Sequence, residues 1–160
     1  MFIVESNPNQ EIQIVLRRIK QKLGFIPPHF ELYATINPQR FMMFLEEINY
    51  ISNHKNINPD FFIFLRYNIA KKYNFAYCYK FNEKMLKAKG YSEFEPLPLD
   101  ERHQKLFNVV MDTMGKPEGF SVMEIESLKQ LGWSDADIFD ALDHGAFLFK
   151  FSKILRAYGK

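Results

Sequence analysis

Two Asn-Pro pairs, at residues 37–38 and 58–59, constrain the fold most, because each is a strong signal for the start of a helix. Asparagine caps the first free N–H groups of a helix, and proline fits the first helical position. After the second pair, the run 61–65 is apolar on all sides, which predicts a buried helix ending near Tyr73. After the first pair, apolar residues recur every three or four positions, at Phe41, Phe44, Leu45, Ile48 and Ile51.

The remaining predicted helices begin at capping residues and end near glycine or proline. Asn74 is expected to cap one of them, Ser121 and Glu124 to form a capping box, and Ser134 to cap the last. No strand-like alternation of apolar and polar residues continues for any length. We therefore predict an all-α, single-domain bundle over residues 1–160, with about seven to eight helices and a short proline-rich linker near 91–98. The further helices are expected over residues 10–23, 29–34, 75–89, 100–114, 121–131 and 135–158.

Composition excludes several classes of function. A formal net charge of +2 gives no case for nucleic-acid binding, which normally needs a clustered basic face. No apolar run approaches the roughly 18 residues of a membrane span, and the N-terminus does not resemble a signal peptide. With a single cysteine, these features predict a cytoplasmic protein without membrane contact. Seventeen Phe and eight Tyr are a large apolar load for one small core, so we expect a homo-oligomer.

Cys78 is the only cysteine, so one chain cannot form an internal disulfide. It is expected near the start of the helix over 75–89, where the helix dipole favours a thiolate. Its neighbours three and four residues away are two amides and two phenylalanines, none of which is a general base. Two interpretations are open from the residues alone, a buried inert cysteine or a reactive thiol.

The four histidines show no metal-type pair, and no glycine-rich phosphate loop is present, so we predict neither a metal nor a cofactor. His54, in a loop, and His103, on a polar helix face, are expected to be solvated. His144 lies among apolar neighbours and is either a core histidine or part of a cavity. The carboxylates of Asp137 and Asp140 are interpreted as surface or capping groups.

The segment NPDFFIFLRYNIAKKYNFAYCYKFNEKMLKAKGYSE resembles the core of the carboxymuconolactone decarboxylase superfamily, and more closely its alkyl hydroperoxidase D-like (AhpD-like) and peroxidase-related branches. The preceding GFIPPHFELYATINPQRFMMF and the C-terminal MEIESLKQLGWSDADIFDALDHGAFLFKFSKILRAYG are similar to the flanking helices of that family. The resemblance covers roughly residues 23 to 159. It implies the family's helical fold and assembly into trimers, dimers or hexamers.

The resemblance fails at most active-site positions. In an ungapped alignment, the family's two cysteines fall on Phe75 and Cys78, its histidine on Asn82 and its relay glutamate on Ile63. The family's cycle needs one thiol to attack a peroxide and a second to resolve the sulfenic acid. A phenylalanine cannot resolve, and neither Asn82 nor Ile63 can accept a proton. The resemblance therefore implies a degenerate site.

Three functions follow from the resemblance. The first is binding of a small apolar ligand or a protein partner, with Ile63 and Phe75 lining the pocket. The second is a one-cysteine alkylhydroperoxidase-type oxidoreductase that reduces a peroxide through Cys78, with Asn82 as hydrogen-bond donor and Tyr67 as proton donor. The third is a decarboxylase-like enzyme acting on a lactone acid. It would use His144 or His29 as the base, and Arg66 would hold a carboxylate.

Overall fold

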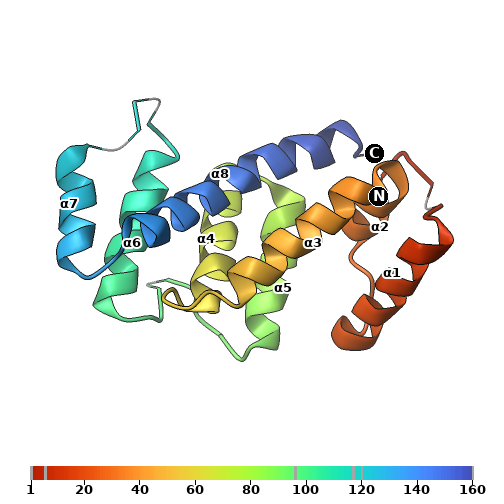
Figure 1. The fold of residues 1–160 in the computed structure, drawn as a ribbon, viewed down its shortest axis with the longest axis horizontal. Coiled ribbons are helices and arrows are strands. Elements are labelled where there is room, and N and C mark those ends of the chain that lie inside the picture. Colours follow the sequence, from red (N-terminus) through yellow and green to blue (C-terminus); the bar gives the residue numbers. More distant parts are fainter. Residues whose placement is uncertain (1, 6, 96, 117, 120, 160) are drawn as a thin grey trace. The chain divides into compact units, whose positions relative to one another are not determined.

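Helices account for nearly all the regular structure in the computed structural model, which describes residues 2–5, 7–95, 97–116, 118–119 and 121–159 (Figure 1). Within those ranges there are eight α-helices, and the only strand-like pairing is a single antiparallel bridge between Phe2 and Gly159. The all-α prediction and the predicted number of helices are confirmed. No helix in the described parts combines the length and apolar character that a bilayer crossing requires.

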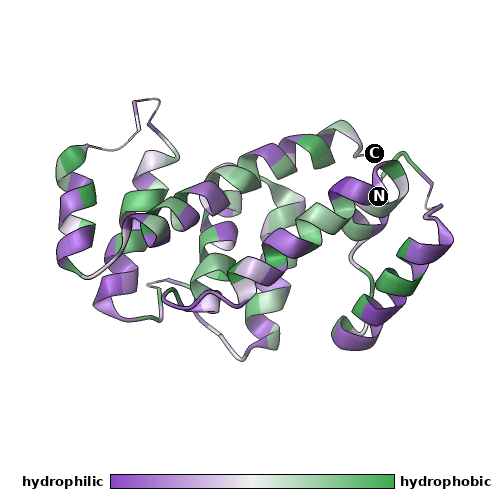
Figure 2. Cartoon of the chain, viewed as in Figure 1, coloured by the Kyte–Doolittle hydropathy of each residue, from purple (hydrophilic) through white to green (hydrophobic). Residues whose placement is uncertain are grey.

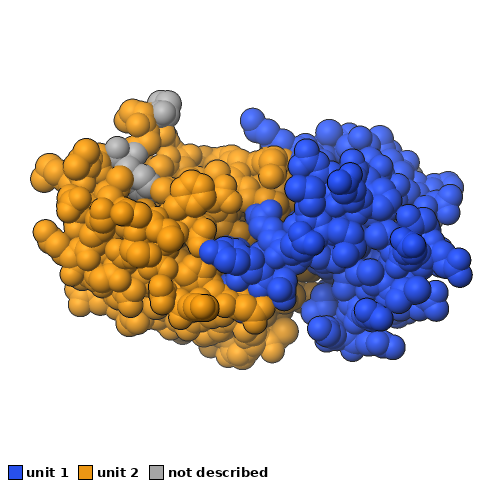
Figure 3. Space-filling view, in the orientation of Figure 1, with its two compact units in different colours: residues 1–52, 153–160 blue, residues 53–152 orange. Residues whose placement is uncertain are grey.

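The chain divides into two compact units, residues 1–52 with 153–160, and residues 53–152 (Figure 3). We call them unit 1 and unit 2. Helix α8 (Asp135–Ala157) contributes most of its residues to unit 2 and its last turns to unit 1. The expectation of one domain stays a prediction.

Unit 1 contains α1 (Gln10–Leu23), α2 (Pro28–Ile36) and α3 (Pro38–Ser52). Asn9 caps α1 by accepting the N–H of Ile12, and hydrophobic and hydrophilic residues occupy different sides of that helix (Figure 2). Helix α2 packs on α3 through edge-to-face contacts among Phe30, Phe41 and Phe44. Such aromatic pairs add roughly 0.5–1.5 kcal/mol beyond the area they bury.

Unit 2 is built around α4 (Pro59–Lys72), which is flanked by α5 (Ala76–Ala88) and α6 (Glu101–Thr113). The all-round apolar run at the start of α4 is buried as predicted, and Phe61, Phe62 and Phe64 are fully inaccessible. Burying one such side chain contributes about 1.5–3 kcal/mol. Helix α4 is therefore the centre of the core of unit 2, and its neighbours are positioned against it.

Most predicted caps are present. Ser121 with Glu124 forms the predicted capping box of α7 (Val122–Gln130). Asp100, which was expected as the first residue of α6, instead caps that helix by accepting the N–H of His103. Ser134 and Asp137 bond reciprocally at the start of α8, because the serine hydroxyl accepts the N–H of Asp137 and the carboxylate accepts the N–H of Ser134. These local signals fix the helix boundaries.

The predicted cap of α5 is wrong. Asn74 has a left-handed backbone, with φ of 54°, and the N-cap residue is Phe75, which makes no side-chain capping bond. Asparagine tolerates this conformation better than most residues, so Asn74 makes the turn between α4 and α5 instead of capping the helix. Cys78 is consequently the third residue of α5, within its first turn.

Glycine allows α8 to approach α6 closely. A Cβ atom added at Gly145 would lie 3.2 Å from Val110 Cγ1 and 3.2 Å from Met114 Sδ. The neighbouring residue on α8, His144, is almost completely buried. The close approach at Gly145 therefore sets the helix spacing beside a buried polar group.

Candidate functional site

The half-buried side chain of Arg66 joins three helices in unit 2. Arg66 of α4 donates through Nε to Asn82 Oδ1 of α5 at 2.9 Å. Its Nη1 lies 2.7 Å from Nε2 of His144 on α8. Arginine remains protonated in proteins and has no acceptor, so Arg66 is the donor in both bonds. We call Arg66, Asn82 and His144 the arginine cluster.

The arginine cluster fixes the protonation state of His144. Its Nε2 must carry a lone pair to accept from Arg66, so the imidazole is neutral in this arrangement. Burial, and then the positive charge of Arg66, lowers the pKa of His144 well below the ordinary value for histidine. The lone pair that a general base would use is thus already bound to a guanidinium.

Asn82 is held at both ends of its amide. Its Oδ1 accepts from Arg66, and its Nδ2 donates to the backbone carbonyl of Cys78 at 2.8 Å. The side chain therefore ties one turn of α5 to the guanidinium. The expectation that Asn82 donates a hydrogen bond in cysteine chemistry stays a prediction, and the amide bond seen here goes to the carbonyl of Cys78.

The thiol of Cys78 contacts a hydroxyl that sequence reasoning missed. Cys78 Sγ lies 3.2 Å from Ser152 Oγ of α8, and either atom can be the donor. Both residues are buried, with 5% and 2% of their surfaces exposed. One turn earlier on each helix, the rings of Phe75 and Phe149 meet edge to face at 5.5 Å. The first turn of α5 thus packs in register along α8, with the thiol inside the contact.

Solved structures with the same arrangement of helices show which fold this is. An uncharacterized peroxidase-related protein from Silicibacter sp. TM1040 superposes with a TM-score of 0.84 over 98% of this chain and 89% of its own, at 15% sequence identity. An uncharacterized peroxidase-related protein from Ralstonia eutropha JMP134, described as an alkylhydroperoxidase AhpD core, gives a TM-score of 0.74 over 95% and 85% of the two chains, also at 15% identity. The chain has the AhpD-like fold. No protein-family model matches the sequence, and no curated protein matches it.

The AhpD-like fold was predicted from the resemblance, and the superpositions confirm it over nearly the whole chain. Such low identity shows the arrangement of the helices and says nothing of the chemistry. The chemistry of this chain depends on its own side chains.

The other predicted site residues lie on α4 and at the start of α5. Ile63 and Phe75 are both buried, as expected of apolar pocket residues, and their role in a pocket stays a prediction. Tyr67 packs its ring against Tyr79 and Phe94. Burial, and then a hydrogen bond with Tyr79, raises the pKa of Tyr67 to about 12. A phenol with so high a pKa is a weaker proton donor than an ordinary tyrosine.

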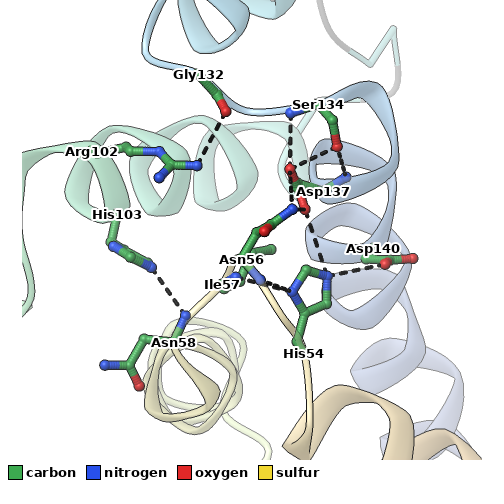
Figure 4. Close-up of polar contacts among 10 residues, drawn as sticks. All are labelled: His54, Asn56, Ile57, Asn58, Arg102, His103, Gly132, Ser134, Asp137 and Asp140. Atoms are coloured by element: carbon green, nitrogen blue, oxygen red, sulfur yellow. Dashed lines mark hydrogen bonds and ion pairs between the residues drawn. The ribbon is translucent and has the colours of Figure 1, made fainter.

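Two histidines that were expected to be solvated are buried, so that prediction is wrong. The side chain of His54 lies against Asp137 and Asp140 of α8 (Figure 4). The side chain of His103 lies against Asp100 and the ring of Trp133. Asp137 was interpreted as a surface or capping group; its 3% exposure excludes the surface position, and its bonds with Ser134 confirm the capping role. Polar partners more than 80 residues away in the chain allow His54 and Asp137 to be buried, whereas His103 bonds to Asp100, three residues away, and to the N–H of Asn58, 45 residues away.

Proposed function

We propose that this chain uses the AhpD-like fold to bind a small apolar ligand and is not a peroxidase with an internal proton relay. The observation that carries the proposal is the arginine cluster. Arg66 donates to Asn82, which occupies the position where the resemblance predicts the relay histidine. The same guanidinium also donates to the buried imidazole of His144.

The cluster supports this proposal because the two side chains that could take the place of the relay histidine are already bonded to other groups. The lone pair of His144 Nε2 is bound by the guanidinium, and the amide of Asn82 bonds to Arg66 and to the carbonyl of Cys78. Loss of a general base typically costs about 10²–10⁴-fold in rate. A single cysteine also cannot resolve its own sulfenic acid within one chain.

The expected ligand is apolar because of what replaces the polar relay positions. Ile63 and Phe75 are hydrophobic and buried, and the ring of Phe75 packs against Phe149 in the turn before the thiol. Apolar side chains around a few fixed polar groups are the usual composition of a small-molecule site.

A one-cysteine peroxidase is the second candidate, and the position of Cys78 favours it. The thiol lies in the first turn of α5, where the helix dipole stabilises an anion, and it contacts the Ser152 hydroxyl. Such an enzyme would need an external thiol to reduce the sulfenic acid. The lactone-acid decarboxylase required Arg66 and His144 to lie together, and they do. Because Arg66 occupies the lone pair of the base, we do not advance that activity.

One pair of experiments separates the two candidates. The first measures iodoacetamide alkylation of Cys78 and turnover of cumene hydroperoxide with excess dithiothreitol, in the wild type and in Cys78→Ser. We expect slow alkylation and equal turnover in both proteins. Fast alkylation below about pH 8, with turnover lost in Cys78→Ser, would establish the peroxidase instead.

The second experiment tests binding directly. Thermal unfolding is followed with a panel of small ketones, esters and long-chain alcohols, in the wild type, in Ile63→Val and in Ile63→Gln. We expect at least one compound to raise the melting temperature of the wild type and of Ile63→Val, and to have a smaller effect on Ile63→Gln. Equal responses of all three proteins, or none from the panel, would count against an apolar site at Ile63.

A further inference from the structure

Three consecutive backbone N–H groups in the loop over residues 53–58, directly before α4, donate to histidine rings (Figure 4). The N–H groups of Asn56 and Ile57 both donate to Nδ1 of His54, at 3.2 and 3.0 Å. The N–H of Asn58 donates to Nε2 of His103 at 3.1 Å. A backbone N–H can only donate, so each of these ring nitrogens must carry a lone pair.

The two rings are therefore neutral in this geometry, and they hold opposite tautomers. His54 has its proton on Nε2, which lies 3.2 Å from Oδ2 of Asp140 and 3.9 Å from Oδ1 of Asp137. His103 has its proton on Nδ1, which lies 2.7 Å from Oδ1 of Asp100. Each ring thus accepts from the loop with one nitrogen and donates to a carboxylate with the other.

Around His54, helix α8 supplies two carboxylates, those of Asp137 and Asp140. The amide Nδ2 of Asn56 also bonds to Asp137, and from α4 the ring of Phe62 lies 5.7 Å from the imidazole. Burial alone would raise the pKa of Asp137, but hydrogen bonds from Ser134 and Asn56 outweigh it and lower the pKa. Asp137 is therefore an anion that would favour a positive charge on His54.

Around His103, the carboxylate of Asp100 contacts the ring, and α4 contributes the ring of Phe61 at 6.1 Å. Trp133 packs on the imidazole edge to face, and the guanidinium of Arg102 lies over the indole, 3.5 Å from its ring centroid. The backbone N–H of His103, and then its ring, lower the pKa of Asp100. Asp100 is therefore also an anion beside a histidine.

We propose that His54 and His103 form an acid-sensitive latch on the loop 53–58, which is closed when both rings are neutral and opens when they take up protons. Each proton would add at the nitrogen that now accepts from the loop, and two donors would then face each other. The carboxylates would hold the imidazolium rings in place, so the backbone of residues 56–58 is released while both rings stay against their carboxylates. Protonation of either ring removes the lone pair that accepts from the backbone, so acid is the signal that opens the latch.

The tautomers give the first test, in the wild-type protein. Long-range ¹H–¹⁵N NMR correlation spectra at about pH 7.5 distinguish the two neutral forms, at a pH above the ordinary histidine range. We expect His54 with its proton on Nε2 and His103 with its proton on Nδ1. The same tautomer in both rings, or a charged ring in either, would overturn the latch.

Amide hydrogen exchange gives the second test, with variants that keep the acceptor but cannot be protonated. Asparagine at 54 offers Oδ1 to the N–H groups two and three residues on, as in an Asx turn. Glutamine at 103 can place Oε1 near the position of the histidine Nε2. In the wild type, we expect exchange protection at residues 56, 57 and 58 to fall on acidification, after correction for intrinsic rates. The fall should be about tenfold for each pH unit below the midpoint of the histidine, because the neutral fraction falls by that factor.

Each variant should prevent the acid loss of exchange protection only at the N–H groups that its own side chain accepts. In His54→Asn, residues 56 and 57 keep their protection in acid and residue 58 still loses it, whereas His103→Gln gives the opposite pattern. Unchanged protection of the wild type at about pH 5.5, a pH below the ordinary histidine range, would overturn the proposal. So would acid loss at residues 56 and 57 in His54→Asn that equals the loss in the wild type.

Discussion

Two regions of unit 2 bury neutral histidines, and they differ in the group that donates to the ring. In the arginine cluster, His144 accepts from a permanent cation, whereas His54 and His103 accept from backbone N–H groups and face carboxylates. A guanidinium opposes protonation of the ring it contacts, and a carboxylate favours it. The first region is therefore a fixed connection between helices, and the second is built to respond to protons.

The largest expected effect comes from introducing the relay that the resemblance implies. Combining Ile63→Glu, Phe75→Cys and Asn82→His would supply the carboxylate, the resolving thiol and the imidazole. We expect cumene hydroperoxide reduction with dithiothreitol to rise by about 10²-fold or more over the wild type, because a base and a second thiol become available. The control omits Phe75→Cys and cannot form the disulfide. A folded triple variant no faster than this control would contradict the assignment of the relay positions.

Removing the guanidinium should destabilise the protein strongly. Arg66→Leu leaves Oδ1 of Asn82 and Nε2 of His144 without their donor, in a buried setting. We expect the free energy of unfolding in urea to fall by about 2–4 kcal/mol. Arg66→Lys keeps the charge and can make fewer bonds, so its loss should be smaller. Equal stability of Arg66→Leu and the wild type would show that the cluster contributes nothing to the fold.

The pH dependence of stability gives an intermediate effect. Burial and Arg66 depress the folded-state pKa of His144, so the unfolded chain takes up a proton that the folded chain refuses. The contribution of His144 is therefore complete above about pH 6.5 and is lost as the pH falls below that value. The double variant His54→Asn/His103→Gln has no histidine in the latch, so the change of its unfolding free energy in urea with pH reports His144 without a contribution from the latch.

Adding Arg66→Leu to that background should make the fall of stability with acid shallower, because one of the two causes of the low pKa of His144 is removed. A steeper fall would mean that Arg66 favours the protonated ring, which its charge does not allow.

The smallest expected effect is at the thiol. Ser152→Ala removes a hydroxyl whose partner is a weak sulfur donor or acceptor, so the unfolding free energy should change by less than about 1 kcal/mol. Ser152→Thr, which keeps the hydroxyl, is the matched control. A much larger loss for Ser152→Ala would mean that the hydroxyl orders the contact between α5 and α8, and that Cys78 is more than a packed side chain.

The sequence predicted the helices well because their signals are local. The Asn-Pro pairs and the serine caps lie within three residues of the N–H groups they affect, and the structure places helices at each of them. The one wrong cap, Asn74, shows the limit of that reasoning, since asparagine is favoured both at caps and in left-handed turns.

The polar sites were harder to predict because they depend on distant partners. Arg66 and His144 are 78 residues apart in the chain, and Cys78 and Ser152 are 74 apart. The burial of His54 depends on a carboxylate 86 residues away. Histidine in a polar segment is usually exposed, and only the tertiary fold supplies the acceptors that reverse this expectation.

The contact between Arg66 and His144 also depends on the glycine beside the histidine, Gly145. It lies next to His144, and because it has no Cβ atom, α8 can approach the side chains of Val110 and Met114 closely. Alanine there would favour the helix locally by roughly 0.5–1 kcal/mol, and would force those side chains to move by a few tenths of an ångström. A hydrogen bond of 2.7 Å between Arg66 and His144 is sensitive to displacements of that size. The absence of a methyl group at residue 145 therefore helps to keep α8 close enough for Arg66 to bond to His144.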